Sequence, residues 1–441
     1  MKPEPSNVNR RFFLETYGCQ MNEYDSSLVA GILESRGYTA TRDPGEADLI
    51  LVNTCSVREN AEETALEKLR SIAHHRRRNP GVRLGVLGCM AENRRESILE
   101  RVPEVDLLLG PDHYDQLGPA LDLPWKDGAA IRGVGPDPSQ TYEGLFPPAP
   151  ASMSAFVAVQ RGCDMKCAYC IVPTTRGPER SRPASDILEE VRRLVDSGVR
   201  EITLLGQTVN AWRADLSFAG LLRELGRVPG LLRIRFTSPH PRYFTDSVCQ
   251  AMAETPTVCP HIHIPVQSGS SRILRIMKRQ YSRDQYLAML EKIRKHLPQA
   301  SFTTDIIAGF PGETEADHND TLSLLDIVRF DAAFMFAYSA RPGTPAALLQ
   351  ESLTDEEKGA RLAQIIDRQA SHSRQRLDER IGLVEEVLLE GSSRRDPGEW
   401  IGKTPHFRKV VVRPPNGAQP GELLQVRIEA RRGTVLRGEA A

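Results

Sequence analysis

Three cysteines lie close together in the middle of the chain, at Cys163, Cys167 and Cys170. They follow an alternating apolar run, residues 156–159, which predicts a strand that ends in a loop. A structural zinc site usually has four ligands, and no fourth Cys or His lies nearby. An iron-sulfur cluster also normally takes four cysteines, so three thiolates would leave one iron free to bind a small molecule. The simpler alternative is a group of buried, reduced cysteines.

Three further cysteines, far apart in the sequence, each follow an apolar run: Cys19, Cys55 and Cys89. A helical pattern follows each run, which predicts a parallel sheet of three or more strands with flanking helices. The runs comprise residues 12–17, 48–53 and 83–88. Because parallel strands place their carboxyl ends at one edge of a sheet, we expect these cysteines to converge there and hold a second cluster. A single cysteine at a strand end is more often a small hydrophobic residue.

The middle of the chain predicts an incomplete (β/α) barrel. A segment rich in Pro and Gly, from about Trp125 to Ser154, predicts a linker that leads into it. Six apolar runs then alternate with helical patterns, about three-quarters of a closed eight-unit barrel. The runs are residues 156–159, 201–205, 233–237, 261–266, 301–307 and 332–338. Small or polar residues follow these runs and could contact a ligand or simply form turns: Gly206-Gln207, Ser238-Pro239-His240, residues 267–270 and residues 309–313.

The C-terminal part predicts a charged helix at residues 355–380 and then a small β-barrel of OB-like type. Between residues 401 and 441 there are eight Lys or Arg and three Glu, although the whole chain has a net charge of -1. The run from Lys403 to Lys409 places His406 and Phe407 among cations, which suits phosphate contact and base stacking. The alternative is a solvated basic barrel without a partner.

Composition sets further limits on the 441-residue chain. Its nearly balanced charge requires any nucleic acid to meet a local basic patch. No apolar stretch is long enough to span a membrane, and residues 1–10 have no apolar core, so we predict a soluble cytoplasmic protein without a membrane partner. Eight cysteines in so long a chain predict metal or catalytic chemistry and not a disulfide framework.

Together these motifs resemble the methylthiotransferases, radical S-adenosylmethionine (SAM) enzymes with an N-terminal three-cysteine domain and a C-terminal TRAM domain. The resemblance covers nearly the whole chain. Three runs resemble the tRNA branch: Asn-Thr-Cys-Ser-Val-Arg-Glu-Asn-Ala at 53–61, Cys-Ile-Val-Pro through Arg-Ser-Arg at 170–182, and His-Ile-His-Ile-Pro-Val-Gln-Ser-Gly-Ser at 261–270. The ribosomal-protein branch typically lacks Ser-Val-Arg-Glu-Asn and Gln-Ser-Gly-Ser. Gly402-Lys403 departs from the Gly-Arg that family members often have.

The resemblance implies an α/β architecture of three domains and a linker. Residues 1–124 would form the methylthiotransferase domain with an auxiliary cluster, and residues 125–154 the linker. Residues 155–382 would form the radical SAM core, a partial (β/α)6 barrel. Residues 383–441 would form the TRAM domain. The implied metal ligands are Cys19, Cys55 and Cys89 for one 4Fe-4S cluster, and Cys163, Cys167 and Cys170 for the other, catalytic one.

The implied reaction replaces the hydrogen on carbon 2 of N6-isopentenyladenosine, beside the tRNA anticodon, with a methylthio group. Two SAM molecules would serve it, one as methyl donor and one as radical source. A radical is needed because an aromatic C–H bond offers no acidic proton. Gln207, Gln267 and Arg279 are candidates to hold SAM, as neutral or cationic groups near the barrel top. Just past the cysteine loop, three arginines could face tRNA phosphate: Arg176, Arg180 and Arg182.

The expected partners are tRNA carrying N6-isopentenyladenosine and an electron donor such as flavodoxin or ferredoxin, and the expected state is a monomer. Two alternatives within the enzymes are methylthiolation of N6-threonylcarbamoyladenosine in tRNA and of a ribosomal-protein aspartate. A third alternative, of a different class, is a non-catalytic iron-sulfur protein that binds RNA. Cluster-dependent cleavage of SAM would separate the enzymes from this last alternative.

Overall fold

The computed structural model describes residues 10–56, 59–123, 130–393 and 396–441. Val57 and Arg58 of the Ser-Val-Arg-Glu-Asn run and the start of the predicted linker lie outside them. The chain packs into two units. The first comprises Met1–Pro148, Gln160–Met165 and Cys170–Arg182, and the second Ala149–Val159, Lys166–Tyr169 and Pro183–Ala441. The sequence did not predict this sharing of the cysteine loop, so the domain boundaries at 124, 155 and 382 stay predictions.

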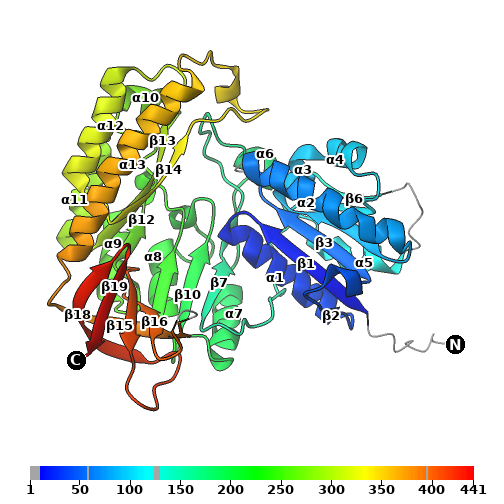
Figure 1. The fold of residues 1–441 in the computed structure, drawn as a ribbon, viewed down its shortest axis with the longest axis horizontal. Coiled ribbons are helices and arrows are strands. Elements are labelled where there is room, and N and C mark those ends of the chain that lie inside the picture. The colour runs from blue at the N-terminus through cyan, green and yellow to red at the C-terminus, as the bar shows by residue number, and fades with distance from the viewer. Residues whose placement is uncertain (1–9, 57–58, 124–129, 394–395) are drawn as a thin grey trace. The chain divides into compact units, whose positions relative to one another are not determined.

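The first unit contains a six-stranded parallel sheet in the order β2-β1-β3-β4-β5-β6 (Figure 1). The strands are β1 (Arg11–Tyr17), β2 (Thr39–Ala40), β3 (Leu49–Thr54), β4 (Arg83–Leu87), β5 (Leu107–Leu109) and β6 (Ile131–Gly133). All six residues of β3 are buried, as expected for a parallel strand with helices on both faces. The three strands that the sequence predicted form adjacent central positions, and the missed strands are too short to show a periodic pattern.

Helices cover both faces of this sheet. Leu28 and Leu33 of α1 pack on one face together with α5, and Leu66 and Leu69 of α2 pack on the other together with α3 and α4. The helices are α1 (Gln20–Glu34), α2 (Glu59–Arg78), α3 (Cys89–Arg94), α4 (Glu96–Arg101) and α5 (Leu117–Asp122). The cysteine loop completes the unit, since β8 (Gln160–Arg161) pairs antiparallel with β9 (Arg180–Ser181) and α6 (Val172–Arg176) lies between them in sequence.

The second unit contains the six predicted parallel strands, arranged as two three-stranded sheets, β11-β10-β7 and β12-β13-β14. The strands are β7 (Ser154–Ala158), β10 (Glu201–Leu205), β11 (Arg233–Phe236), β12 (His261–His263), β13 (Ser301–Ala308) and β14 (Ala332–Ala337). Ile234 links the sheets, because its N–H donates to the Thr257 carbonyl (2.7 Å) and its own carbonyl accepts from the Cys259 N–H (2.9 Å). The α/β fold with a partial barrel is therefore confirmed.

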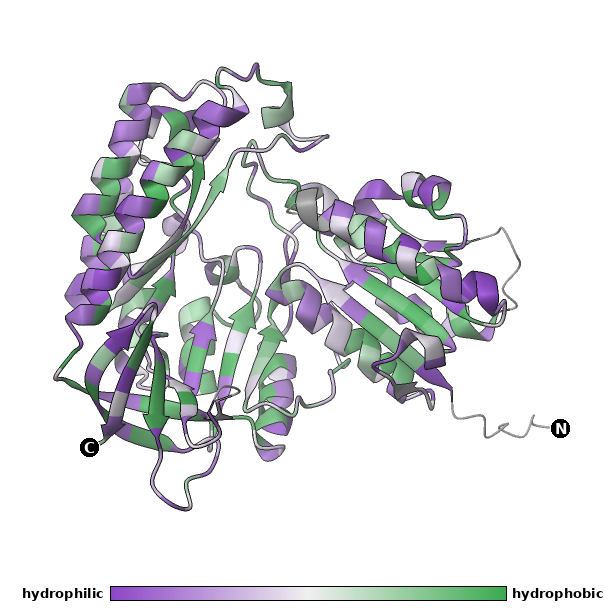
Figure 2. Ribbon diagram, in the orientation of Figure 1, coloured by the Kyte–Doolittle hydropathy of each residue, from purple (hydrophilic) through white to green (hydrophobic). Residues whose placement is uncertain are grey.

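Helices cover the outer face of this arc, and their apolar sides form its core while their hydrophilic sides face outward (Figure 2). The helices are α7 (Ala184–Asp196), α8 (Phe218–Gly226), α9 (Asp246–Glu254), α10 (Ser271–Ile276), α11 (Arg283–His296), α12 (Glu315–Val328) and α13 (Asp355–Asp378). Capping boxes fix where three of them begin, at Ser282–Gln285, Thr314–Asp317 and Thr354–Glu357. No helix of the described residues is long and apolar enough to cross a membrane.

The end of the chain forms a closed five-stranded barrel in the order β15-β16-β17-β19-β18, as the sequence predicted. Its strands are β15 (Val384–Ser392), β16 (Trp400–Lys403), β17 (Lys409–Arg413), β18 (Leu423–Arg432) and β19 (Val435–Ala440). The sequence did not predict β16. Gly402 interrupts its pattern, because a Cβ at that position would lie 2.4 Å from the Leu388 carbonyl oxygen of the neighbouring strand.

The barrel is attached to the second unit through the run 403–409. Arg235 of β11 is buried, donates to the carbonyls of Thr404 and Pro405 (both 2.9 Å), and pairs with Glu201 of β10 at 2.9 Å. The ring of Phe407 stacks on His261 of β12 with 5.0 Å between centroids. These contacts hold the barrel against the amino ends of β11 and β12.

The prediction that the run 403–409 contacts phosphate is wrong for Arg408. Its guanidinium is buried and pairs with Asp331 at 2.8 Å. Lys403 pairs with Glu390 at 2.6 Å and lies over the Phe407 ring. Lys409 is the cation of this run that stays exposed. Most of the charge in the run therefore serves internal contacts.

We expect Arg235→Met to destabilise the protein by about 3–5 kcal/mol, because it leaves the buried Glu201 carboxylate without its cation. The double variant Arg235→Met with Glu201→Met should recover much of that loss, since it removes both buried charges. Denaturant unfolding of the cluster-free protein measures both values. A double variant no more stable than the single one would contradict this account of the pair.

Candidate active site

Cys19, Cys55 and Cys89 lie at the carboxyl-end edge of the first sheet, after β1, β3 and β4. Cys19 is exposed, and Cys55 and Cys89 are buried. Since β1, β3 and β4 are neighbours in the sheet, the folded chain brings together three residues that the sequence separates, as predicted. Their role as cluster ligands stays a prediction.

Two asparagines and two glycines pack tightly around these cysteines. The Asn22 side-chain amide donates to Asn53 Oδ1 (3.1 Å), and that of Asn53 donates to the Asn22 carbonyl (3.0 Å). A Cβ on Gly18 would lie 2.3 Å from the Cys55 Cβ, and one on Gly88 would lie 2.2 Å from Asn53 Oδ1. Both glycines also have positive φ angles, so a side chain at either position would displace a cysteine loop.

Arg176 of α6 places a buried positive charge near these thiols. Although Cys19 is exposed as a residue, surrounding protein partly desolvates its thiol; a hydrogen bond with Cys55 and the charge of Arg176 outweigh this desolvation and lower the pKa of Cys19 to about 6. Burial raises the pKa of Cys89. The site thus favours the thiolate at Cys19, the form that binds metals.

Asp25 of α1 is fully buried and ties the cysteine loop to this site. Its Oδ1 accepts from Arg161 (2.8 Å) and its Oδ2 from Arg176 (2.9 Å). Arg161 comes just before the loop and Arg176 just after it in sequence. The Arg161 guanidinium also lies over the Tyr142 ring, 4.6 Å from its centroid. One carboxylate therefore holds both ends of the loop within the first unit.

The prediction that Arg176, Arg180 and Arg182 face tRNA phosphate is wrong, because all three are buried in the first unit. Arg180 forms two hydrogen bonds with the Asp112 carboxylate, at 2.7 and 3.0 Å. Arg182 donates to the Tyr24 hydroxyl (3.2 Å). The sequence showed the arginines but not their partners, Asp25, Asp112 and Tyr24, which lie 68 to 158 residues away along the chain.

The cysteine loop itself is shared by the two units. Gly162 has φ of +74°, and a Cβ there would lie 1.9 Å from the Pro178 carbonyl, so only glycine fits before Cys163. The Cys163 N–H donates to the Gly177 carbonyl (3.1 Å) within the first unit. In the second unit the Arg279 guanidinium donates to Cys167 Sγ (3.3 Å).

Arg279, a predicted SAM-binding residue, uses its remaining donors within the second unit. It bonds the Tyr281 hydroxyl (2.9 Å) and the Pro265 carbonyl (3.2 Å). Hydrogen bonds to cysteine sulfurs tune iron-sulfur clusters, so the contact with Cys167 suits a residue that acts on the cluster. Its direct contact with SAM stays a prediction.

The other two predicted SAM-binding residues lie at the carboxyl ends of their strands. Gln207 follows β10, and its Oε1 is buried without a hydrogen-bond partner among the described residues. Gln267 follows β12 with φ of +73°, and its backbone bonds Asp305 (2.8 Å) and Ile307 (2.9 Å). The side chain of Gln267 is buried.

His240 is a residue of this edge that the sequence indicated only as part of a polar cluster. Its Nε2 is buried and lacks a partner among the residues that the structure describes. Burial and the nearby Arg279 and Arg242 lower the pKa of His240 to about 3, so the ring is neutral. Buried polar atoms normally have partners. The unpaired atoms of Gln207 and His240 therefore fit a polar ligand such as SAM.

No three His, Cys, Asp or Glu side chains within the described ranges lie close enough to share one metal ion. A 4Fe-4S cluster binds each cysteine to a different iron atom, so its sulfurs do not converge on a single point.

Known families match all three sections of the chain. Residues 11–110 match the family described as uncharacterized protein family UPF0004, residues 157–325 the radical SAM superfamily, and residues 378–441 the TRAM domain. The middle match contains the loop with Cys163, Cys167 and Cys170.

Three curated relatives match at nearly full length. The relative from Chloroherpeton thalassium is 44% identical over 98% of this chain and 97% of its own length. The relative from Chlorobaculum tepidum is 42% identical over the full length of both chains, 100% of each. The relative from Leptothrix cholodnii is 42% identical over 99% of this chain and 94% of its own length. Each is a tRNA-2-methylthio-N(6)-dimethylallyladenosine synthase. The chain belongs to this family. It is a radical SAM enzyme, and such enzymes bind a 4Fe-4S cluster and SAM.

Solved structures agree in fold alone. The radical SAM methyltransferase TsrM of Kitasatospora setae, with cobalamin and a cluster bound, has a TM-score of 0.61 at 14% identity, covering 77% of each chain. The cobalamin-dependent SAM radical enzyme OxsB has a TM-score of 0.52 at 13% identity, covering 80% of this chain and 56% of the other. These likenesses confirm the radical SAM fold.

In cluster-free protein we expect alkylation of Cys19 by iodoacetamide to rise with a midpoint at a pH of about 6, the pKa of its thiol. Cys55→Ala should move that midpoint toward the ordinary thiol value of about 8.5, because it removes the main stabilising hydrogen bond. Mass spectrometry of the alkylated peptides measures each cysteine separately, and buried Cys249 provides the unreactive control. An unchanged midpoint in the variant would contradict the pairing of Cys19 with Cys55.

Proposed function

We propose that the chain converts N6-isopentenyladenosine beside the tRNA anticodon to its 2-methylthio derivative, using one SAM as methyl donor and another as radical source. The observation that carries the proposal is the match of the whole chain to synthases of 2-methylthio-N(6)-dimethylallyladenosine. Isopentenyl and dimethylallyl describe the same substituent. The substrates of the other methylthiotransferases are not favoured, since the relatives named here share the dimethylallyladenosine activity.

We assign Cys163, Cys167 and Cys170 to the cluster that binds SAM, and Cys19, Cys55 and Cys89 to a second 4Fe-4S cluster. When bound, the clusters and SAM supply the radical chemistry that an aromatic C–H bond requires. We further propose that Gln207, His240 and Gln267 orient SAM at the strand ends; Gln207 and His240 each carry a buried atom without a partner among the described residues, which a ligand would satisfy. Arg279 donates to Cys167 Sγ and lowers the electron density on that ligand.

The protein's own charges support the second assignment. Arg176 lies buried near Cys19 and Cys89 and favours their deprotonated forms. The Asp25 carboxylate, which Arg161 also pairs with, holds Arg176 in place. A cationic group beside three thiolates offsets part of the negative charge that a cluster ligand set gathers.

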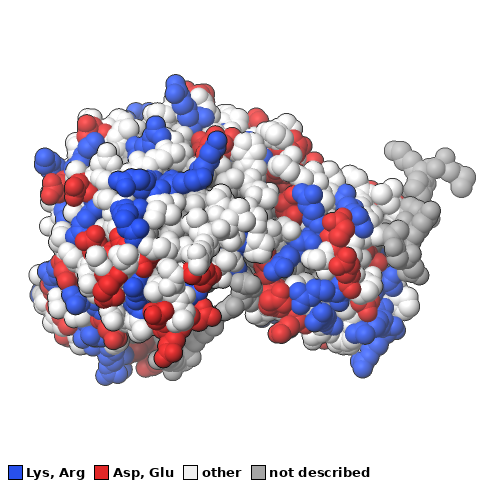
Figure 3. All heavy atoms as spheres, turned by 90° about the horizontal axis from the view of Figure 1, so that it is seen from above, with Lys and Arg blue, Asp and Glu red and all other residues white. Residues whose placement is uncertain are grey.

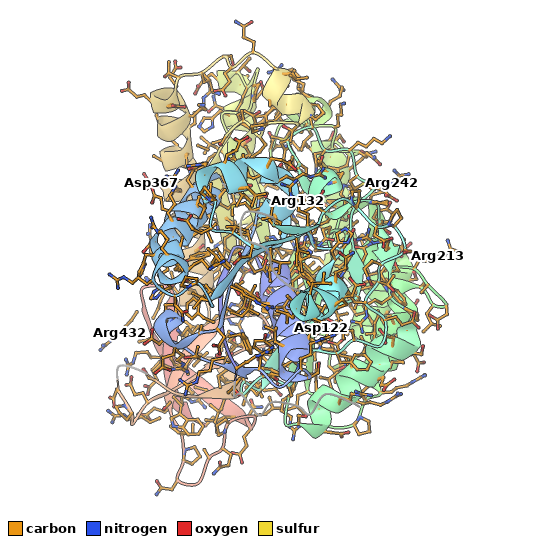
Figure 4. All side chains as sticks on the ribbon, turned by 90° about the vertical axis from the view of Figure 1, so that its right-hand side faces the viewer. Asp122, Arg132, Arg213, Arg242, Asp367 and Arg432 are labelled. Atoms are coloured by element: carbon orange, nitrogen blue, oxygen red, sulfur yellow. The ribbon has the colours of Figure 1, made fainter. Side chains whose placement is uncertain are left out.

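For tRNA binding we propose the exposed cations of the barrel, in place of the buried Arg408. Lys409 and Arg413 lie on β17 and Arg432 on β18, and all three are exposed. Arg432 projects at the margin of the view in Figure 4. Acidic and basic side chains are interspersed over the face seen in Figure 3, so RNA binding relies on local cations. A flavodoxin or ferredoxin as electron donor, a monomeric state and a cytoplasmic location complete the proposal.

Replacing Cys163, Cys167 and Cys170 together by Ala should remove about half of the iron and abolish reductive cleavage of SAM. Replacing Cys19, Cys55 and Cys89 should also remove about half of the iron but leave 5'-deoxyadenosine formation in place while methylthio product is lost. Anaerobic iron assays and chromatography of both products provide the measurements.

The matched controls are Cys249→Ala and Cys259→Ala, which lie outside both groups. Each should keep nearly full iron and turnover. Formation of 5'-deoxyadenosine by the first triple variant, or loss of a cluster in either control, would overturn the ligand assignment.

Lys409→Glu with Arg413→Glu should weaken tRNA binding and flatten its salt dependence, by roughly 0.7–0.9 in log–log slope for each lost phosphate contact. Filter binding over a salt series measures both effects. The control pair Arg192→Glu with Lys295→Glu removes the same charge from exposed sites on α7 and α11. Equal losses in the two pairs would show that net charge, and not the barrel surface, governs binding.

A further inference from the structure

We propose that Phe334 and Phe336 of β14 form the apolar surface that holds the dimethylallyl group of the substrate adenosine. The inference rests on the proposed function and deepens it, because it assigns the residues that distinguish the modified adenosine from plain adenosine. Phe334 is 57% exposed and Phe336 is 37% exposed. Two exposed aromatic side chains on the same face of one strand form an unusual surface for a parallel sheet, whose faces are normally covered.

The register of the sheet places both rings on the inner face of the arc. Phe334 pairs with Asp305 and Phe336 with Ile307 of the neighbouring β13. Met335, between them, packs on the opposite side against the core that α12 and α13 cover. The helices therefore bury one side of β14, whereas the two phenylalanines on the other side remain partly exposed to solvent.

At the amino ends of the strands, the Phe407 ring of the barrel already covers this inner face. His261 stacks on Phe407, and the Arg235 guanidinium lies over the same ring at 4.9 Å from its centroid. His261 and Arg235 lie at the amino-terminal part of the inner face, and Phe407 belongs to the run 403–409 that attaches the barrel. A ligand on the inner face must therefore lie toward the carboxyl ends of the strands.

Polar groups next to Phe334 suit a purine base. His263 pairs with Asp305 at 3.4 Å and meets the edge of the Phe334 ring at 5.8 Å between centroids. His263 also bonds Thr303 (3.0 Å). His263 holds the Asp305 carboxylate in place, and that carboxylate can accept a hydrogen bond from the amino group of an adenine, while the Phe334 ring offers the base a stacking surface.

The apolar surface also continues toward the SAM-binding edge. Ile307, the partner of Phe336, packs with Ala168 of the cysteine loop and with Phe310. The Ile307 N–H donates to the Gln267 carbonyl (2.9 Å). A base stacked at Phe334 would thus extend its apolar substituent along a surface that leads to the residues proposed to hold SAM.

The chemistry of the substituent fits these neighbours. A dimethylallyl group is a branched hydrocarbon without hydrogen-bonding atoms, so only removal from water stabilises it. Contact with two aromatic rings provides that removal and requires no new polar partner. The occupant to which we commit is therefore the modified adenosine, and a protein partner on the same face is an outcome that the test separates.

The test compares two anticodon stem-loop RNAs that differ only in the dimethylallyl group, bound by the cluster-loaded protein under anaerobic conditions. We expect the wild-type protein to bind the modified RNA more tightly. Phe334→Ala with Phe336→Ala should weaken binding of the modified RNA by about tenfold and leave binding of the unmodified RNA nearly unchanged. Fluorescence anisotropy measures the four dissociation constants.

Ile327→Ala on α12 is the matched control, because this apolar side chain is 55% exposed on the outer helices. It should keep the full preference for the modified RNA. Phe334→Leu with Phe336→Leu should keep most of it, since leucine retains an apolar contact. Iron content and RNA-independent SAM cleavage of each variant should equal those of the wild type.

Three outcomes would overturn the inference. An unchanged preference in the double alanine variant would show that the dimethylallyl group binds elsewhere. Equal losses for both RNAs would assign the surface to general RNA stacking, and retained RNA binding with loss of a protein complex would assign it to a protein partner. A wild-type protein that neither prefers the modified RNA nor methylthiolates it would instead refute the proposed function itself.

Discussion

The pairing of Asp25 with two arginines is the constraint on which the first unit depends. A carboxylate without exposure to solvent needs a cation, and Asp25 has two, from residues on either side of the cysteine loop. Because α1 begins directly after Cys19, the same short helix positions one cysteine and holds the arms of the loop that carries three others. The buried ion pairs therefore fix the position of the cysteine loop as well as stabilising the unit.

Much of the fold follows from the sequence, because parallel strands that are buried on both faces give strong apolar runs. Those runs predicted β1, β3, β4 and all six strands of the central arc, and with them the meeting of Cys19, Cys55 and Cys89 at one edge. The two- and three-residue strands β2, β5, β6, β8 and β9 are too short for a periodic pattern and were missed, whereas the three-residue β12 was predicted because it begins the longer run 261–266. Strand β16 was also missed, because Gly402 interrupts its pattern.

The fate of the arginines shows where sequence reasoning fails. The sequence suggests exposed side chains for the three arginines that follow the cysteine loop, Arg176, Arg180 and Arg182. In the folded chain each one has a partner that is distant in the sequence. Arg408, just before β17, is buried against Asp331, whereas the adjacent Lys409, the first residue of β17, is exposed. Whether a cation is buried or exposed depends on residues far away in the sequence, so the sequence alone does not predict it. The spacing of the three loop cysteines, in contrast, is visible in the sequence itself.

The sharing of the cysteine loop between two packing units also orders events during synthesis. The sheet of the first unit is encoded before residue 134, but the arginines that neutralise Asp25 come after residue 160. A nascent chain that ends in the linker therefore has a buried carboxylate and no cation for it. During synthesis the first unit therefore cannot complete the buried ion pairs of Asp25 until both Arg161 and Arg176 have been made.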